Sequence, residues 1–283
     1  MIPSNLLIRI KFARACAVAS LLLAGFACHA ARPGGTTPAA TGFVARTTTV
    51  DGMLYRYQVF VPRGTDRGAR PPIILSLHGA GERGMDGQLQ TMVGLGPVVR
   101  GRAESFPAVV VMPQAPSDSV WSGAPARAAM QALDAALLEF HGDSARVYLT
   151  GLSMGGYGTW QLALEYPGRF AALVPVCAGV RPPSGFSSIR VAPVPSDAQD
   201  PYAYVAARLA SMPVWLFHGA EDRAVPVTES RNMAEALRRV GAPVRYTEYA
   251  GVGHNSWESA YNEPELWRWL WAQHLSRRVA PSP

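Results

Sequence analysis

The chain has 283 residues, 48% of them hydrophobic, with 26 basic and 20 acidic side chains and a net charge of +6. This composition supplies enough apolar material for one substantial core and is compatible with a single domain. The basic residues are scattered, and apart from pairs such as Arg238–Arg239 and Arg277–Arg278 they form no concentrated stripe. The charge pattern therefore argues against a nucleic-acid-binding protein.

The first thirty residues have the pattern of a secretory signal peptide. Arg9, Lys11 and Arg14 precede the apolar run ACAVASLLLAGFAC, and small residues follow in CHAARPGG. A basic start, a short apolar run and a small-residue exit are typical of such signals. The run is shorter than the roughly 20 apolar residues of a membrane span. We expect cleavage after Ala30, giving a signal peptide over 1–30, export to the periplasm or beyond, and no stable membrane insertion afterwards.

A lipid-anchored Cys28 is the alternative to cleavage after Ala30. Lipoprotein signals prefer a Leu-like residue three positions before the cysteine, and Gly25 stands there. Cleavage after Ala30 would leave Cys177 as the only cysteine of the mature chain, so no intramolecular disulfide could form. We expect Cys177 to be a small buried side chain. No Cys/His cluster has zinc spacing, and neither a P-loop nor a G-x-G-x-x-G after a strand is present, so we expect no cofactor and no metal.

After a linker at 31–42, the segment ARTTTVDGMLYRYQVFVP alternates apolar and polar residues around Asp51-Gly52, which predicts a β-hairpin. Short apolar runs then predict strands, and longer periodic segments between them predict helices. The strands are expected at 72–79, 107–114, 146–151, 170–179, 213–219 and 243–249, and the helices at 124–140, 154–166, 227–240 and 262–275. Buried Val/Ile/Leu strands that alternate with helices predict an α/β fold with a mainly parallel sheet, helices on both faces, and the antiparallel hairpin at one edge.

Residues 180–200 break this rhythm, because they are rich in Pro and Ser and have no periodicity. Loops of this length inside a domain are usually functional or disordered. We expect this segment to be a cap or pocket rim of the domain predicted over 43–278.

The motif GLSMG, from Gly151 to Gly155, matches the G-x-S-x-G nucleophile elbow. It follows a predicted strand and precedes a predicted helix, which is the context that this motif requires. Ser153 would stand at the strained turn as a nucleophile. Gly151 and Gly155 would leave room for neighbouring strands, and Gly156 would allow close packing of helix on sheet. The alternative is a glycine-rich turn without chemistry.

A serine hydroxyl is a weak nucleophile unless a base takes its proton, and in this arrangement the acid and the histidine follow the serine in that order. Asp222 lies in the loop after WLFHG, and His254 lies in the glycine-rich loop GVGHNSW. His254 would act as general base and then general acid, while Asp222 would hold its tautomer. Glu221 is the alternative acid, and His218 is expected to be structural.

The segment HGAGERG, residues 78–84, follows an early predicted strand. A loop at this place supplies a backbone N–H to an oxyanion hole, and the residue after the nucleophile supplies another. We assign these donors to Ala80 and Met154, with Gly81 as the alternative to Ala80. His78 would anchor the loop.

Together these segments resemble the α/β-hydrolase superfamily, and more narrowly the exported bacterial carboxylesterases of the feruloyl-esterase, polyhydroxybutyrate-depolymerase and "predicted peptidase" group. The matching pieces are LHGAGERG, VVVMPQAP, RVYLTGLSMGGYGTW, YPGRFAALVPVCAG, PVWLFHGAEDRAVPV and GVGHNSW. The resemblance implies an enzyme that cleaves carboxylic esters, small or polymer-borne, through an acyl-enzyme intermediate on Ser153, with Asp222 and His254 as partners. A serine peptidase with the same triad, or a catalytically silent binding module, are the alternatives.

Three aromatic residues are candidates for the walls of a substrate pocket: Trp121, Trp257 and Phe186. Trp257 follows His254 by three residues and Phe186 lies in the irregular segment. Packing in the core is the alternative role for the tryptophans, and it is the role that we expect for Trp160.

Overall fold

The computed structural model describes residues 41–63 and 70–275. The predicted signal peptide, its cleavage site and Cys28 lie outside the described residues. The elements that follow belong to the second of two units along the chain, Ala40–Pro283. The linker that was predicted to reach residue 42 ends earlier, because strand β1 already begins at Gly42.

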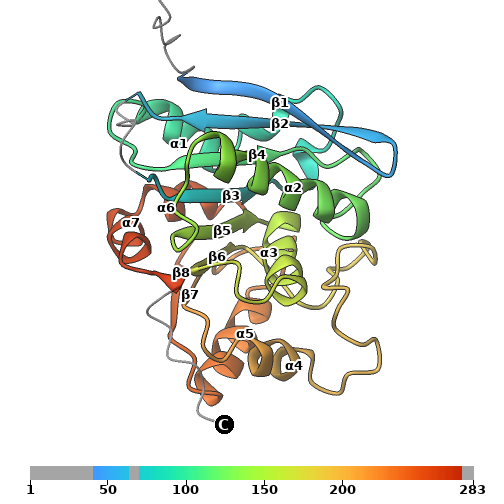
Figure 1. Cartoon of the computed structure of the whole chain (residues 1–283). Coiled ribbons are helices and arrows are strands. Elements are labelled where there is room, and N and C mark those ends of the chain that lie inside the picture. Colours follow the sequence, from blue (N-terminus) through green and yellow to red (C-terminus); the bar gives the residue numbers. More distant parts are fainter. Residues whose placement is uncertain (1–40, 64–69, 276–283) are drawn as a thin grey trace, which may run out of the picture. The chain divides into compact units, whose positions relative to one another are not determined.

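The second unit contains one eight-stranded sheet in the order β1-β2-β4-β3-β5-β6-β7-β8 (Figure 1). The strands are β1 (Gly42–Val50), β2 (Met53–Val61), β3 (Ile73–Leu77), β4 (Val109–Pro113), β5 (Val147–Leu152), β6 (Ala172–Val176), β7 (Val214–Gly219) and β8 (Val244–Tyr249). β1 pairs antiparallel with β2, and β2 antiparallel with β4, whereas the remaining pairs are parallel. The sheet is therefore the mainly parallel one expected, with the hairpin at its edge.

The hairpin turns at Asp51 and Gly52, whose φ angles are 52° and 78°. Two successive residues with positive φ make the tight two-residue turn that matches the twist of the flanking strands, and Asp-Gly adopts it readily. The hairpin prediction is confirmed.

The described residues also form seven α-helices and two short 3₁₀ helices, which lie between the strands except for α6 and α7 after β8. They are α1 (Leu95–Gly101), α2 (Gly123–Glu139), α3 (Met154–Glu165), α4 (Pro201–Arg208), α5 (Thr228–Arg239), α6 (Trp257–Asn262), α7 (Pro264–Trp271), η1 (Ala80–Glu82) and η2 (Leu89–Thr91). The helix predicted over 262–275 is wrong in its extent, since two short helices occupy the region and the break falls at Glu263 before Pro264. A residue before proline is driven away from the helical conformation.

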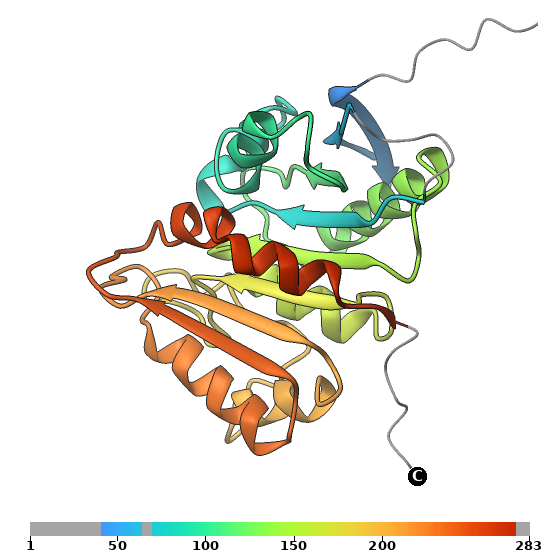
Figure 2. The same cartoon turned by 90° about the vertical axis from the view of Figure 1, so that its left-hand side faces the viewer.

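Two apolar cores cover the two faces of the sheet. Alternate residues of β4 point to opposite sides, so that Val109 and Val111 belong to one core and Val110 and Met112 to the other. Side chains of α2, α3, α4 and α5 complete the first core, and those of α1, α6 and α7 complete the second. Figure 2 shows α7, in red, lying across the second face. The layers match the predicted cover of helices on both faces.

Residues 180–200 contain no helix or strand between β6 and α4. Three of their side chains, Val180, Ile189 and Val191, are buried in the first core, and the Ala192 N–H donates to Gln161 Oε1 of α3 at 2.6 Å. The segment is thus attached to α3 by side-chain packing and a hydrogen bond rather than by regular structure. Among the described residues, no helix combines the length and apolar character needed to cross a membrane.

Candidate active site

The turn between β5 and α3 places Ser153 in a strained conformation, with φ 52° and ψ −120°. A non-glycine residue with positive φ is uncommon and is found at functional turns. The glycines around it are required by close backbone approach. A Cβ atom on Gly151 would lie 2.1 Å from the carbonyl oxygen of Gly155, and one on Gly155 would lie 2.1 Å from that of Leu77 at the end of β3.

The Ser153 hydroxyl lies 2.9 Å from Nε2 of His254, and Nδ1 of His254 lies 2.7 Å from Oδ2 of Asp222. The three side chains follow β5, β7 and β8, whose carboxyl ends share one edge of the sheet because these strands are parallel. Asp222 is buried, while Ser153 and His254 are partly exposed. Of the two adjacent acids, the structure brings Asp222 and not the exposed Glu221 to the imidazole.

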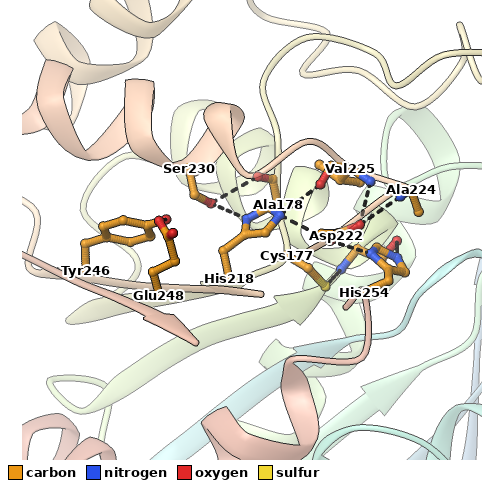
Figure 3. A network of polar contacts seen from close by, with 11 residues as sticks. Cys177, Ala178, His218, Asp222, Ala224, Val225, Ser230, Tyr246, Glu248 and His254 are labelled. Carbon is orange, nitrogen blue, oxygen red and sulfur yellow. Dashed lines mark hydrogen bonds and ion pairs between the residues drawn. The ribbon is translucent and has the colours of Figure 1, made fainter. Parts of the chain in front are cut away.

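Every lone pair of the Asp222 carboxylate has a donor nearby. Oδ1 accepts the N–H groups of Ala224 at 2.8 Å and Val225 at 2.9 Å, while His254 and His218 approach Oδ2 (Figure 3). Burial by itself raises the pKa of Asp222, but the hydrogen bonds from the two imidazoles and the Val225 N–H outweigh it and hold the pKa well below its usual range. An ionised Asp222 requires the His254 proton on Nδ1, which leaves Nε2 as an acceptor for the serine hydroxyl.

Cys177 lies directly beneath Ser153. The Ser153 N–H donates to Val176 O at 2.9 Å and to Cys177 Sγ at 3.2 Å, and Cys177 itself has a positive φ of 41°. The side chain is buried as predicted, but the contact with the elbow was not foreseen, since it joins residues 24 positions apart. Burial raises the pKa of the Cys177 thiol, which therefore stays protonated.

Cys177 Sγ lies within 4.8 Å of ligand atoms of Asp222 and His254, the spacing of a possible metal site. The donor set does not fit one. A thiol must lose its proton to bind a metal, whereas this one is held protonated, and the carboxylate lone pairs are engaged by N–H groups.

The loop after β3 runs beside Ser153. A Cβ atom on Gly79 would lie 3.6 Å from Cβ of Ser153, and the Gly79 N–H is bound to Glu82 Oε2 at 2.9 Å. Ala80 and Met154 are the first residues of η1 and α3, where N–H groups have no acceptor within the helix. Gly81 faces open space, with no atom within 4 Å of its Cβ position. These N–H groups are therefore candidates for binding a negative oxygen.

His78 ties this loop to the core. Nδ1 lies 2.6 Å from the Gly79 carbonyl, and Nε2 lies 2.9 Å from the Ala115 N–H. The two partners require a neutral ring with its proton on Nδ1, and burial lowers the pKa of His78 to about 4. Trp121 donates its indole N–H to the His78 carbonyl at 3.0 Å and packs edge-on against its ring.

The three aromatic pocket candidates have different surroundings. Trp121 is only 2% exposed and supports the loop from within the core. Trp257 is half-buried and stands perpendicular to the His254 imidazole, with 5.6 Å between the ring centres. Phe186 is 56% exposed and makes no ring contact with another aromatic side chain of residues 41–63 and 70–275. The structure thus brings Trp257 alone of the three against the imidazole.

Two further side chains lie close to this constellation. Arg83 places Nε and Nη2 3.2 and 3.0 Å from Sδ of Met154. His218, expected to be structural, lies with Nε2 3.1 Å from Asp222 Oδ2. The spacing of four residues between His218 and Asp222 was visible in the sequence, but a strand end and a turn had to be placed before it indicated a contact.

Comparisons with known proteins show which family and folds the chain is similar to. Residues 119–275 match the model of the prolyl oligopeptidase family. A solved thermostable esterase superimposes with a TM-score of 0.70 and 34% identity, over 82% of this chain and 63% of that one. A ferulic acid esterase has the same fold, with a TM-score of 0.59 and 19% identity over 81% and 96% of the chains.

Among curated proteins, an uncharacterized secreted protein of Arthroderma benhamiae is 28% identical over 214 residues, which is 67% of this chain and 22% of that protein. The chain thus spans about a fifth of the length of this relative.

The sheet order, the elbow and these similarities place the chain in the α/β-hydrolase superfamily. Within that superfamily, the chain belongs to the prolyl oligopeptidase family.

Proposed function

We propose that this protein is an exported serine esterase that cleaves carboxylic esters through an acyl-enzyme intermediate on Ser153. The observation that carries the proposal is the line of hydrogen bonds from the Ser153 hydroxyl through His254 to Asp222, of 2.9 and 2.7 Å, at the end of β5. The similarity to a thermostable esterase at 34% identity supports an ester substrate, small or polymer-borne.

In the first half of the reaction, Ser153 Oγ attacks the ester carbonyl carbon while His254 Nε2 accepts the hydroxyl proton. The carbonyl oxygen becomes negative and is bound by the N–H groups of Ala80 or Gly81 and of Met154. Collapse of this intermediate breaks the bond to the alkoxy oxygen, to which the imidazolium returns the proton. The alcohol leaves, and the acyl group stays on Ser153.

In the second half, water attacks the acyl carbon and His254 takes the water proton. The bond between the acyl carbon and Ser153 Oγ then breaks, the imidazolium gives its proton to Oγ to restore the serine hydroxyl, and the carboxylic acid leaves. Asp222 remains ionised throughout and stabilises the imidazolium, so no net proton is stored on the acid. Trp257, beside the imidazole, is the side chain that we propose to line the acyl or alcohol side of the site.

A peptidase with the same three side chains is the second candidate, because the matching family model is named for an oligopeptidase. Ester and amide cleavage share every step above and differ in the leaving group. We further propose that residues 1–30 are a signal peptide, that the catalytic domain begins with β1 at Gly42 and extends to residue 278, and that 180–200 forms its pocket rim. The similarity to a protein described as secreted supports export.

The proposal predicts that Ser153→Ala lowers p-nitrophenyl acetate and butyrate turnover by about 10³-fold or more. Ser105→Ala, which changes an exposed serine between α1 and β4, is the matched control and should retain wild-type turnover. Labelling by a fluorophosphonate probe should follow the same pattern. A variant Ser153→Ala that still turns over ester would exclude the mechanism, and a wild-type protein that neither turns over ester nor is labelled would point to a binding module.

A panel of peptide amides assayed beside the esters separates the two candidates, since a dominant amide preference would favour the peptidase.

A further inference from the structure

A second histidine is buried against the acid of the proposed triad. His218 lies at the end of β7 and is 0% exposed. Its Nε2 lies 3.0 Å from the Val225 carbonyl and 3.1 Å from Asp222 Oδ2 (Figure 3). Both of these partners are acceptors, so Nε2 must carry a proton.

The other ring nitrogen is held by α5. Nδ1 of His218 lies 2.7 Å from the Ser230 hydroxyl, which is also 3.3 Å from the Ala178 carbonyl. The Ser230 hydroxyl donates to the Ala178 carbonyl, and its oxygen holds the Nδ1 side of the ring in place. The His218 ring is therefore held from both sides, and its Nε2–H is aimed at the Asp222 carboxylate.

The two oxygens of Asp222 divide their partners by kind. Oδ1 accepts two backbone N–H groups of its own loop, whereas Oδ2 accepts the imidazoles of His254 and His218. Without His218, Oδ2 would keep His254 as its one donor and a buried lone pair would lose its partner, which is costly in a site closed to water.

We propose that His218 is a positioning residue for catalysis: its Nε2–H holds Oδ2 of Asp222 in place for His254 and limits how strongly that oxygen attracts a proton. This inference rests on the proposed function, because it assigns His218 a part in tuning the same base. It departs from a purely structural role, in which the ring would only fill space at the end of β7.

The charged groups that face His218 come from each neighbouring element. Glu248 of β8 is its partner in the strand register, and its carboxylate is bound by Arg231 of α5 and by the Tyr246 hydroxyl. These bonds lower the pKa of Glu248 to about 2, with Arg231 the larger cause.

Cys177 directly follows β6, and burial keeps its thiol protonated. Burial also raises the pKa of Tyr246, and the bond to Glu248 adds to this. Neither Glu248, Tyr246 nor Cys177 changes charge between about pH 5 and pH 9. These three groups therefore do not cause a shift of the pH profile in that range, and we assign such a shift to the Asp222–His254 pair.

The test compares three histidine variants by their kcat, KM and pH profiles with p-nitrophenyl acetate. His218→Phe fills the space but has no donor, and His218→Gln can place an amide N–H near the position of Nε2. His274→Gln is the matched control. Its neighbours Gln273 and Leu275 bond to Tyr148 and Ala145 at the amino end of β5, the opposite edge of the sheet from Ser153.

For His218→Phe we expect kcat to fall roughly 10- to 100-fold, with KM within about twofold of wild type. We also expect the midpoint of the acidic limb of kcat/KM to move to higher pH. A carboxylate that accepts one hydrogen bond fewer holds the His254 imidazolium more strongly, so a higher pH is needed to free the base. His218→Gln should restore the midpoint and most of kcat, and His274→Gln should match wild type.

An acidic limb that stays at the wild-type pH in His218→Phe, whether activity is kept or falls, would overturn the inference. Equal losses in the Phe and Gln variants would do the same. Titrating active sites with a fluorophosphonate corrects each rate for misfolded protein. The proposed function fails separately, by turnover that survives Ser153→Ala.

Discussion

His78 is a buried histidine whose two ring nitrogens are both committed, one to the Gly79 carbonyl and one to the Ala115 N–H. It joins the loop that carries Ala80 to the strand end that precedes Trp121. Protonation would put a second proton on Nε2, opposite an N–H donor, in a place closed to water. Burial therefore lowers the pKa of His78 from 6.5 to about 4.

A lowered histidine pKa makes the protein less stable in acid. Above pH 6.5 the ring is neutral in both the folded and unfolded states, so it has no effect there. As the pH falls from 6.5 to about 4, His78 is protonated in the unfolded state but not in the folded state. The free energy of unfolding therefore decreases by up to roughly 3 kcal/mol. We therefore expect the free energy of unfolding, measured with urea at a series of pH values, to fall more steeply below pH 6.5 in wild type than in His78→Asn. Asn can keep a donor to the Gly79 carbonyl and cannot titrate, and parallel slopes would contradict the prediction.

At the scale of elements, the packing of α3 against the sheet determines the position of Ser153. The first turn of α3 passes so close to β3 and to the residues after β6 that side chains are excluded there. A Cβ atom on Gly155 would lie 2.1 Å from the Leu77 carbonyl oxygen, and one on Gly156 would lie 2.6 Å from Cβ of Ala178. This close packing places Ser153 in the turn at the carboxyl end of β5.

We expect Gly155→Ala to lower the free energy of unfolding by about 3 kcal/mol or more, because backbone atoms cannot move aside for the methyl group. Gly101→Ala is the matched control. This exposed glycine ends α1 with no atom within 4 Å of its Cβ position, and alanine there should leave stability unchanged or raise it by up to about 1 kcal/mol. Chemical denaturation of both variants measures the difference, and similar effects at the two glycines would refute the steric argument.

For the whole molecule, the proposed export sets where the mature chain begins. If the first thirty residues are removed, mass spectrometry of the exported protein should find Ala31 at the N-terminus. Cys28→Ser is the informative variant. Serine is also a small residue, so the same N-terminus is expected under cleavage after Ala30, whereas a lipid anchor would be lost. An acylated Cys28 at the N-terminus of the wild-type protein would establish the lipoprotein alternative instead.

The sequence by itself determined the features that depend on neighbouring residues. Val/Ile/Leu runs marked the six later strands, Asp51-Gly52 marked the hairpin turn, and G-x-S-x-G marked the strand–turn–helix elbow. Each of these is set by side-chain burial or backbone dihedrals within a few residues. Helix α4 was not predicted, because eight residues are too few to show a clear helical period. A signal for its start was present, since Asp200 caps the helix and Pro201 is its first residue.

Only the tertiary structure decided which side chains meet. The parallel order β5-β6-β7-β8 brings the ends of distant strands to one edge, and this places His254 between Ser153 and Asp222 and sets Cys177 beneath the elbow. It also turns His218 toward the acid. Such contacts join residues tens of positions apart or lie across a turn, and their geometry depends on strand register and helix packing. Composition and local pattern do not encode that geometry position by position.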